Sequence, residues 1–545
     1  VHQAFAGALD ICYERIRSIQ REARERGVSG RPRWPAIVLR TPKGWTGPDV
    51  VDGEPVTGTF RAHQVPLARV RANEAQLAML EAWMRSYQPE RLFDEGGWLI
   101  PELASLAPRG DRRMGANPHV NGGRLLVDLD LPAFQDYALP ITRHGAEHHE
   151  NTRPLGTMLR DVFVRNAEQA NFRIFSPDEL TSNRLEAVLE VENRCFVGPT
   201  LDIDSHVSPD GRVMEVLSEH NCEGWLEGYL LTGRHGFYVT YEAFAMVQAS
   251  MTVQHTKWLQ EAIELPWRAP VSSLNILLTS TCWRNDHNGF SHQGPGLIDV
   301  MLSKRGTVAR IYLPPDANCL LSVADHCLRS RNYVNLIVID KQPHLQYLPM
   351  DEAIEHCTRG ASAWKWASND EGVEPDVVLA AAGDVPTMET LAAVEWLRRR
   401  VPELKVRVVN VVDLMTLFPP EHHPHGMSET RFVEMFTADK PVVFAFHGYR
   451  RVVHEIVHGR VNAERFHVRG FNEQGTTTTP FDMVVLNGMS RYHLAILALH
   501  HATRIRPQAQ PLIAELEHLI QQAGAYAREH LEDPPEIRDW TWSGA

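Results

Sequence analysis

Residues 283–296 form a polar loop, WRNDHNGFSHQGPG, between two apolar segments. The loop follows a predicted strand at 273–281, and open α/β sheets bind ligands at the carboxyl ends of their strands. His287, Asn288 and His292 could therefore contact a sugar or a phosphate group together. A solvated loop that caps the next helix is the alternative. A zinc site is disfavoured, because no third ligand stands at a recognisable interval from the two histidines.

Three acids recur at helical spacing in the segment 213–233. Glu219, Glu223 and Glu227 stand four residues apart, so their carboxylates share roughly one helix face. Three acids on one face are typical of a solvated surface. The apolar residues around them leave room for one acid to be buried, and a buried carboxyl with a raised pKa is suited to general acid and base catalysis at neutral pH.

Further candidates stand near the ends of other predicted elements. Tyr241 and Phe244 are three residues apart and could form a wall against a flat ring, although most aromatics so spaced belong to a core. Ser182 and Arg184 share one loop, where the arginine could bind phosphate or only a surface carboxylate. Lys341 ends an apolar strand, at the ligand-facing edge, but a single lysine decides little.

Two histidine-rich stretches lie at 144–149 and 422–425. Adjacent histidines on an extended chain point in opposite directions, so neither stretch is a ready set of metal ligands. We predict that both are surface loops.

Composition excludes several classes of protein. The 545 residues include 55 basic and 68 acidic ones, and the net charge of -13 argues against a nucleic-acid-coating protein. The seven cysteines form no CxxC pair, which favours a reducing cytoplasm over a disulfide framework. No apolar run of about 18 residues and no signal peptide stand in the sequence, so neither a membrane span nor secretion is predicted. The first residue is not Met, and we expect the chain to begin partway through a larger protein.

Alternating strand and helix patterns at 151–345 predict a parallel sheet covered on both faces. After the polar stretch 368–375 the alternation resumes as a separate α/β domain. Upstream, an apolar segment at 34–40 predicts a buried strand that leads into a Gly/Pro turn with Lys43. Residues 49–150 read as a long, partly ordered crossing between domains with one helix at 67–87. The predicted fold class is a multi-domain α/β protein.

Seven segments together resemble the phosphoketolases, a thiamine-diphosphate family related to transketolase. They are KGWTGP, FRAHQVPL, RMGANPHVNGG, FSPDELTSNRL, LSEHNCEGWLEGYLLTGRHG, WRNDHNGFSHQGPG and DKQP. The resemblance covers nearly the whole chain and implies a thiamine-diphosphate-binding, transketolase-like fold.

The resemblance also implies a division into domains. Residues 1–115 are the end of a pyrophosphate-binding domain with a linker, 116–348 a pyrimidine-binding domain and 349–545 a C-terminal α/β domain. The family's GDGE-type signature, which holds magnesium and the cofactor diphosphate, is not in the sequence. The Mg²⁺ ligands are therefore expected in a missing N-terminal part, and none is named in this chain.

The implied reaction converts xylulose 5-phosphate, and often fructose 6-phosphate, with inorganic phosphate into acetyl phosphate, an aldose phosphate and water. The two-carbon fragment must lose a hydroxyl before phosphate attacks it, and a histidine cluster supplies proton donors for such steps near neutral pH. The resemblance further implies a homodimer or a higher homo-oligomer with active sites between subunits. The net charge and the lack of a long apolar run exclude nucleic-acid and membrane partners from the prediction.

The family motifs assign a role to each candidate residue. Glu219 matches the acid that activates the cofactor, which leaves Glu223 and Glu227 as helix-face residues. The cofactor-binding set is Glu219, Tyr241, Phe244 and Lys43. The histidines of the substrate channel are His63, His287 and His292, and the set that contacts substrate or phosphate is Gln64, Ser182, Arg184, Tyr241, Asn288 and Lys341.

The sequence departs from the family pattern at Asn285, where a Gln is common, and in the segment 487–495, where the match is weaker. Two other functions stay open. A transketolase-like enzyme would pass the two-carbon unit to an aldose instead of phosphate. A non-catalytic assembly partner is the alternative from another class of protein.

Overall fold

A computed structural model describes residues 2–178, 180–284, 286 and 289–544 of the protein. The chain divides into two compact units, Val1–Arg109 and Gly110–Ala545, which are described separately.

The first unit is helical, with one short hairpin. Its elements are α1 (His2–Arg26), α2 (Glu74–Ser86), α3 (Pro101–Leu106), β1 (Val50–Val51) and β2 (Glu54–Pro55). The predicted helix 67–87 begins late, at Glu74, because the Asn73 side chain accepts hydrogen bonds from the N–H groups of Ala75 and Gln76 and so caps the helix there. A small core of Val51, Val56 and Leu67 lies beside this helix.

The predicted strand at 34–40 is wrong. These residues form no strand, and Val38 is 84% exposed. A strand needs a neighbour to satisfy its backbone N–H and C=O groups. Within the described part of the first unit, the only paired strands are the two-residue β1 and β2, which pair with each other.

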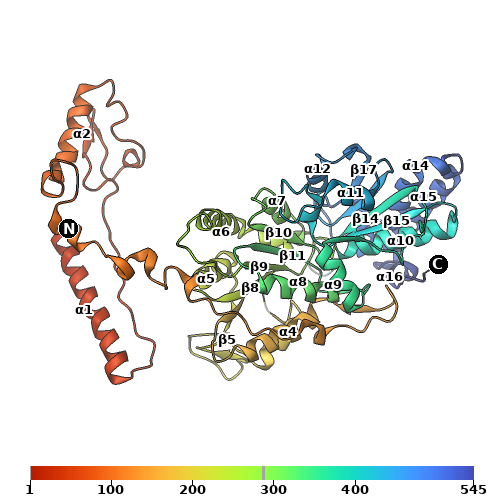
Figure 1. Ribbon diagram of the computed structural model, residues 1–545, viewed down its shortest axis with the longest axis horizontal. Coiled ribbons are helices and arrows are strands. Elements are labelled where there is room, and N and C mark those ends of the chain that lie inside the picture. The colour runs from red at the N-terminus through yellow and green to blue at the C-terminus, as the bar shows by residue number, and fades with distance from the viewer. Residues whose placement is uncertain (1, 179, 285, 287–288, 545) are drawn as a thin grey trace. The chain divides into compact units, whose positions relative to one another are not determined.

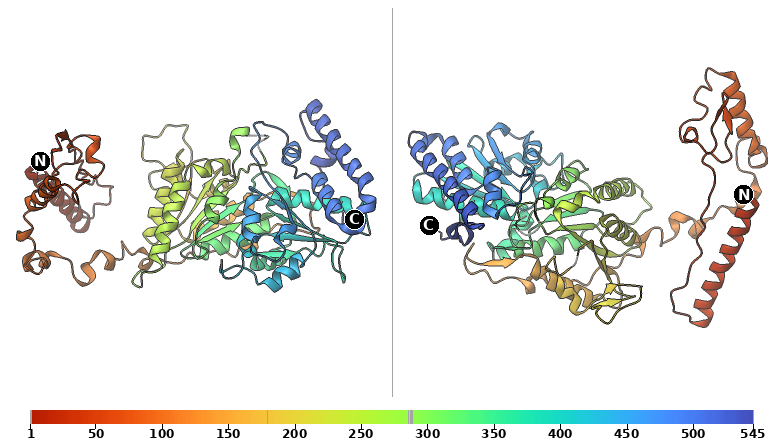
Figure 2. Two further views of the ribbon diagram at one scale, coloured as in Figure 1. Left: turned by 90° about the horizontal axis from the view of Figure 1, so that it is seen from above. Right: turned by 180° about the vertical axis from the view of Figure 1, so that it is seen from behind.

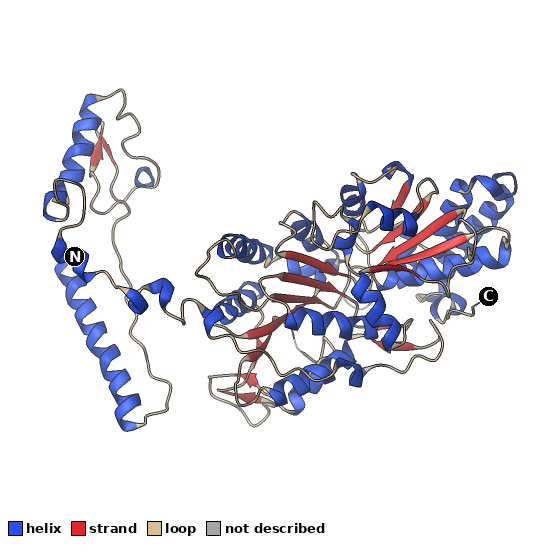
Figure 3. Ribbon diagram, in the orientation of Figure 1, coloured by secondary structure: helices blue, strands red, loops and turns tan. Residues whose placement is uncertain are grey.

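The second unit contains a large sheet whose strand pairs are all parallel, as predicted (Figures 1 and 3). Its spatial order is β10-β11-β9-β8-β4-β7-β5-β6. The strands are β4 (Phe172–Ser176), β5 (Arg194–Cys195), β6 (Val207–Ser208), β7 (Val213–Glu215), β8 (His235–Thr240), β9 (Leu274–Leu278), β10 (Ala309–Tyr312) and β11 (Val334–Val338).

Helices cover both faces of this sheet (Figure 2). They are α4 (Thr152–Arg165) and α8 (Ala317–Arg329) on one face, and α5 (Glu219–Leu231), α6 (Ala249–Ala262) and α7 (Leu297–Leu302) on the other. Successive side chains of a strand point to opposite faces. Phe237 and Val239 therefore pack with α4 and α8, whereas Tyr238 packs with α5, α6 and α7.

A second sheet follows, in the order β13-β15-β14-β16-β17, with only β13 antiparallel. Its strands are β13 (Ala361–Ala363), β14 (Val377–Ala382), β15 (Val406–Val411), β16 (Val442–Phe446) and β17 (Phe466–Arg469). The helices here are α9 (Met350–Arg359), α10 (Asp384–Arg400), α11 (Glu429–Phe436), α12 (Arg451–Val457), α13 (Pro480–Leu486), α14 (Arg491–His501), α15 (Ala509–His530) and α16 (Pro535–Arg538).

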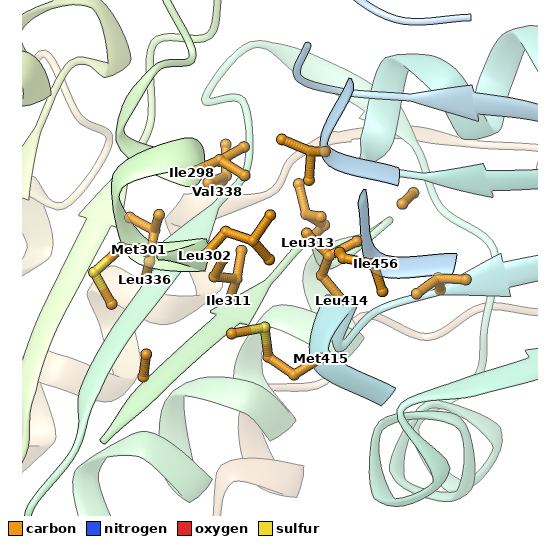
Figure 4. Close-up of a cluster of buried hydrophobic side chains, with 14 of the residues drawn as sticks. Ile298, Met301, Leu302, Ile311, Leu313, Leu336, Val338, Leu414, Met415 and Ile456 are labelled. Atoms are coloured by element: carbon orange, nitrogen blue, oxygen red, sulfur yellow. The ribbon is translucent and has the colours of Figure 1, made fainter. Parts of the chain in front are cut away.

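One hydrophobic cluster joins the two sheets (Figure 4). Ile298 and Ile311 come from the central sheet layer, and Leu414 and Ile456 come from the C-terminal one. The antiparallel pair β3 (His148–Glu150) and β12 (Pro343–Leu345) adds a further link within the second unit. Both sheets thus belong to one compact unit, and the domain boundary predicted at 348/349 stays a prediction.

The histidine-rich stretch 422–425 is not wholly a surface loop. His423 is only 2% exposed, and its Nε2 is 3.1 Å from the backbone oxygen of Ala309 on β10. The prediction is wrong here because the loop packs against the central sheet.

Among the described residues, no helix is both long and apolar enough to cross a membrane.

Candidate active site

The predicted site residues follow the carboxyl ends of neighbouring parallel strands. Glu219 comes after β7, Ser182 after β4, Tyr241 after β8, the loop 283–296 after β9 and Lys341 after β11. These five strands are adjacent in the order β11-β9-β8-β4-β7. Because parallel strands all end at the same edge, residues that are far apart in sequence meet there.

Ser182, Tyr241 and Lys341 form one contact group. The hydroxyls of Ser182 and Tyr241 are hydrogen-bonded to each other. Lys341 Nζ donates to Ser182 Oγ at 3.2 Å and lies 4.0 Å from the centre of the Tyr241 ring. Lys341 is only 3% exposed. A shielded ammonium with two hydroxyls is a donor set suited to a phosphate or to sugar hydroxyls.

Three rings form a wall beside this group. The rings of Tyr241 and Phe244 have centroids 6.1 Å apart and planes 21° apart. The His292 ring lies edge-on to Phe244, with centroids 5.0 Å apart, and its centroid is 5.8 Å from that of Tyr241. The predicted aromatic wall and one predicted histidine are therefore brought together.

The three acids of α5 differ from one another in burial. Glu219 is the first residue of the helix and is half-buried. Glu223 is fully buried, and Thr252 Oγ1 donates to its carboxyl group at 2.8 Å. Glu223 is therefore the one acid of the three that is buried, a possibility that the sequence left open, and Thr252 of α6 packs against it. Glu227 is half-buried, with Oε2 at 3.7 Å from His255 Nδ1.

Burial raises the pKa of Glu223 well above its usual range, the Thr252 hydrogen bond opposes this rise, and the Glu227 charge adds to it. The folded protein therefore keeps the Glu223 proton at pH values where the unfolded chain has lost it. The free energy of unfolding must therefore fall as pH rises from the ordinary pKa of Glu to the raised pKa that Glu223 has in the folded protein.

Glu223→Gln is expected to remove this pH dependence, because an amide does not titrate. The Tm of the variant relative to wild type should rise steadily as pH increases from about 5 to 8. Thermal unfolding at a series of pH values checks this. The exposed Glu261→Gln serves as the control and should show a pH-independent difference. If the Tm difference between Glu223→Gln and wild type were also the same at every pH, that result would contradict a buried Glu223 that keeps its proton in the folded protein.

Asp340, which sequence reasoning missed, ties two strand ends together. Its buried Oδ2 accepts hydrogen bonds from Thr281 N at 3.0 Å and Thr281 Oγ1 at 2.7 Å. Burial would raise the pKa of Asp340, but the imidazole of His344, whose Nε2 lies 3.6 Å from Oδ1, and the charge of Arg284 hold it below its usual range. The carboxylate thus fixes Lys341 beside the start of the 283–296 loop. The sequence signal that could have identified Asp340 is its position directly before Lys341 at the end of a predicted strand.

Glu242 and His447 are a second missed feature. Glu242 Oε1 accepts a hydrogen bond from His447 Nε2 at 2.8 Å, and Oε2 accepts one from Cys282 N at 2.8 Å. Ligand atoms of Glu242, Cys282 and His447 lie within 4.8 Å of one another, which is metal-like spacing. Both carboxylate oxygens of Glu242 already accept N–H hydrogen bonds, so this side chain has its polar partners without a metal ion. No sequence signal joins residues 205 positions apart.

Three predicted residues lie in the first unit. Lys43, His63 and Gln64 are exposed, and Lys43 Nζ is 2.9 Å from His63 Nδ1. Their predicted roles in the cofactor and substrate sites stay predictions.

Arg184 has a different neighbour from the predicted phosphate group. Its Nε donates to Glu150 Oε1 at 2.6 Å, at the end of β3. A phosphate role for Arg184 stays a prediction, in which the ligand would compete with Glu150. The predictions for Asn285, His287 and Asn288 fall outside the described residues.

Three family models match the chain. They are the XFP N-terminal domain at residues 1–125, D-xylulose 5-phosphate/D-fructose 6-phosphate phosphoketolase at 153–330, and the XFP C-terminal domain at 341–542. A probable phosphoketolase of Rhodopseudomonas palustris is 59% identical over 100% of this chain and 69% of its own length. Probable phosphoketolase 2 of Nostoc sp. is 56% identical over 99% of this chain and 68% of its own length. The chain belongs to the phosphoketolase family.

As a phosphoketolase chain, the protein is an enzyme of the lyase class. The family identity implies dependence on thiamine diphosphate. The chain spans about 69% of the length of this Rhodopseudomonas palustris relative, and the expectation that the Mg²⁺ ligands lie outside this chain stays a prediction.

Solved transketolases share the predicted fold. The enzyme of Pichia stipitis in complex with sedoheptulose 7-phosphate has 15% identity and a TM-score of 0.51, covering 80% of this chain and 53% of the transketolase. The enzyme of Leishmania mexicana has 15% identity and a TM-score of 0.50, covering 79% and 52%. The chain thus spans about half the length of these transketolases, and the likeness shows a transketolase-like α/β fold.

Proposed function

We propose that this phosphoketolase chain cleaves xylulose 5-phosphate with inorganic phosphate to acetyl phosphate, glyceraldehyde 3-phosphate and water. Fructose 6-phosphate is the proposed second substrate, with erythrose 4-phosphate as the aldose product. The observation that carries the proposal is the contact group of Ser182, Tyr241 and Lys341 beside the rings of Phe244 and His292, at adjacent strand ends.

The residues of this site fit thiamine diphosphate. Tyr241 and Phe244 present nearly parallel rings, which suit a flat pyrimidine. Glu219 offers a half-buried carboxyl at the same sheet edge. When bound, the cofactor supplies the nucleophilic carbon and the electron sink that cleavage beside a ketone carbonyl requires. The proposed ligands in this chain are Glu219, Tyr241, Phe244 and Lys43.

Each remaining residue is assigned one task. Glu219 holds and exchanges the proton of the aminopyrimidine ring, the task of a positioned acid. His292, His63 and His287 are the proposed proton donors, one of which protonates the hydroxyl that leaves the two-carbon fragment as water. Lys341 and Ser182 bind a phosphate, with Gln64, Arg184 and Asn288 as the further proposed contacts. Tyr241 orients Ser182 through their shared hydrogen bond.

Acetyl phosphate trapping as a hydroxamate tests the proposal. The mixture contains the protein, xylulose 5-phosphate, inorganic phosphate, thiamine diphosphate and Mg²⁺, with no acceptor aldose. We expect acetyl phosphate, and we expect EDTA to abolish it because Mg²⁺ is proposed to neutralise the cofactor diphosphate. Activity should return when Mg²⁺ is restored.

Two other results would overturn the proposal. No acetyl phosphate, but two-carbon transfer once ribose 5-phosphate is added, would indicate a transketolase-like transferase. No product with either acceptor would indicate a non-catalytic assembly partner.

We also propose that the enzyme is a homodimer in the cytoplasm. Exposed apolar side chains such as Ile11, Val38 and Trp98 in the first unit support association. None of the seven cysteines forms a disulfide in the described structure, which supports a reducing compartment. Light scattering on purified protein and cell fractionation test the two statements. A monomer mass, or recovery outside the cytoplasmic fraction, would contradict them.

A further inference from the structure

A buried hydrogen-bonded pair, Glu242 and His447, links the central and C-terminal family domains next to the candidate site. Glu242 lies in the segment matched by the central family model, and His447 lies in the segment matched by the C-terminal one. Both side chains are only 1% exposed. Burial by itself would lower the pKa of His447, but the charge and hydrogen bond of Glu242, followed by the charges of Asp384 and Asp340, raise it overall. The two side chains are joined by the hydrogen bond between His447 Nε2 and Glu242 Oε1 at 2.8 Å.

The pair is held in place from both domains. On the C-terminal side, a Cβ added to Gly383 would lie 2.8 Å from the Cβ of His447, so only glycine permits this close approach. His447 N also donates to Ala382 O at 3.0 Å. On the central side, Glu242 N donates to Ser280 O at 3.1 Å. The hydrophobic cluster of Figure 4 packs the same two layers together.

Two parts of the candidate site depend on this pair. Glu242 directly follows Tyr241, the residue that contacts Ser182, Lys341 and the other rings of the wall. The other part is the beginning of the 283–296 loop. Cys282 N donates to Glu242 Oε2 at 2.8 Å, and Trp283 Nε1 donates to His447 O at 2.9 Å.

We propose that Glu242 and His447 are positioning residues of the phosphoketolase site, through which the C-terminal domain sets the placement of Tyr241 and of the 283–296 loop. Neither residue is assigned a proton-transfer step. The expected loss of kcat rests on the proposed function, whereas the placement of Tyr241 and of the 283–296 loop by the two residues does not.

The matched control is a second buried pair of similar construction. Glu389 and Arg491 are 1% and 5% exposed, and Glu389 Oε1 accepts from Arg491 Nη2 at 2.7 Å. Both residues belong to the C-terminal domain, on α10 and α14, and neither is hydrogen-bonded to Tyr241, Cys282 or Trp283 in the described structure. Glu389→Gln therefore perturbs a buried carboxylate of equal burial without touching the proposed positioning contacts.

The experiment compares Glu242→Gln, His447→Gln, the double variant and Glu389→Gln. Two measurements are made on each: kcat and KM for acetyl phosphate formation, and hydrogen exchange of the Cys282 amide by mass spectrometry. Misplacement of catalytic groups by about 1 Å costs on the order of 100-fold in rate. We expect such a loss in kcat for each single variant, and exchange at Cys282 faster by at least about tenfold.

The double variant separates positioning from simple destabilisation. Two glutamines can hydrogen-bond to each other and to Cys282 N without charge, so we expect the double variant to be no slower than either single one, as for residues that act as a unit. Glu389→Gln should lower Tm but change kcat by less than about threefold and leave Cys282 exchange unchanged.

Loss of activity in proportion to loss of Tm across all four variants would overturn the inference, as would unchanged exchange at Cys282 in the Glu242 and His447 variants. If a single variant does not fold, the double variant still tests the positioning role, because its Cys282 exchange and kcat are compared with those of Glu389→Gln. If wild-type protein makes no acetyl phosphate, the proposed function fails separately, and the exchange result still decides the positioning.

Discussion

Glu219→Gln is expected to lower kcat for acetyl phosphate formation by about 1000-fold, within the range for loss of a general acid or base. An amide occupies nearly the same space as the carboxyl but cannot exchange the proton of the aminopyrimidine ring. Because Glu219 is the half-buried first residue of α5, the substitution should leave the fold intact. Steady-state kinetics at saturating cofactor and a thermal unfolding curve make the measurement.

Glu227→Gln is the matched control, since it makes the same substitution on the same helix at a position outside the site. It should keep kcat within about threefold of wild type. A Glu219→Gln variant with near wild-type kcat would show that another acid activates the cofactor, and the fully buried Glu223 would then be the first one to examine.

Lys341→Met should lower kcat/KM by about 100-fold, because a charge-assisted hydrogen bond to a phosphate is worth roughly 1.5–3 kcal/mol. Methionine has nearly the length of lysine but removes the ammonium that lies against Ser182 and the Tyr241 ring. We expect the loss mainly in KM for a phosphate-bearing substrate, since the contact is made in the bound ground state as well as during reaction.

The control for Lys341→Met is Lys257→Met, which removes an exposed ammonium from α6 and should leave both kinetic constants unchanged. Varying inorganic phosphate and sugar phosphate separately identifies which of the two the lysine binds. An unchanged KM for both, with normal folding, would remove Lys341 from the phosphate-contact set.

Local patterns predicted most of the second unit because the positions of strands and helices follow from hydrophobic periodicity. The alternation at 151–345 became the parallel sheet, and the candidates Ser182, Tyr241, Phe244, His292 and Lys341 met at its carboxyl edge. The strand at 34–40 failed because an apolar run favours a strand only where another strand pairs with it.

By itself, the sequence determined the α/β class, the family and the strand ends that carry the site. Only the tertiary structure decided which acid of α5 is buried, since periodicity places Glu219, Glu223 and Glu227 on one face but does not say where α6 crosses it. The same holds for the pairing of Glu242 with His447 across two domains. Burial and long-range contacts depend on how elements pack, and residues 205 positions apart leave no local pattern that reveals their contact.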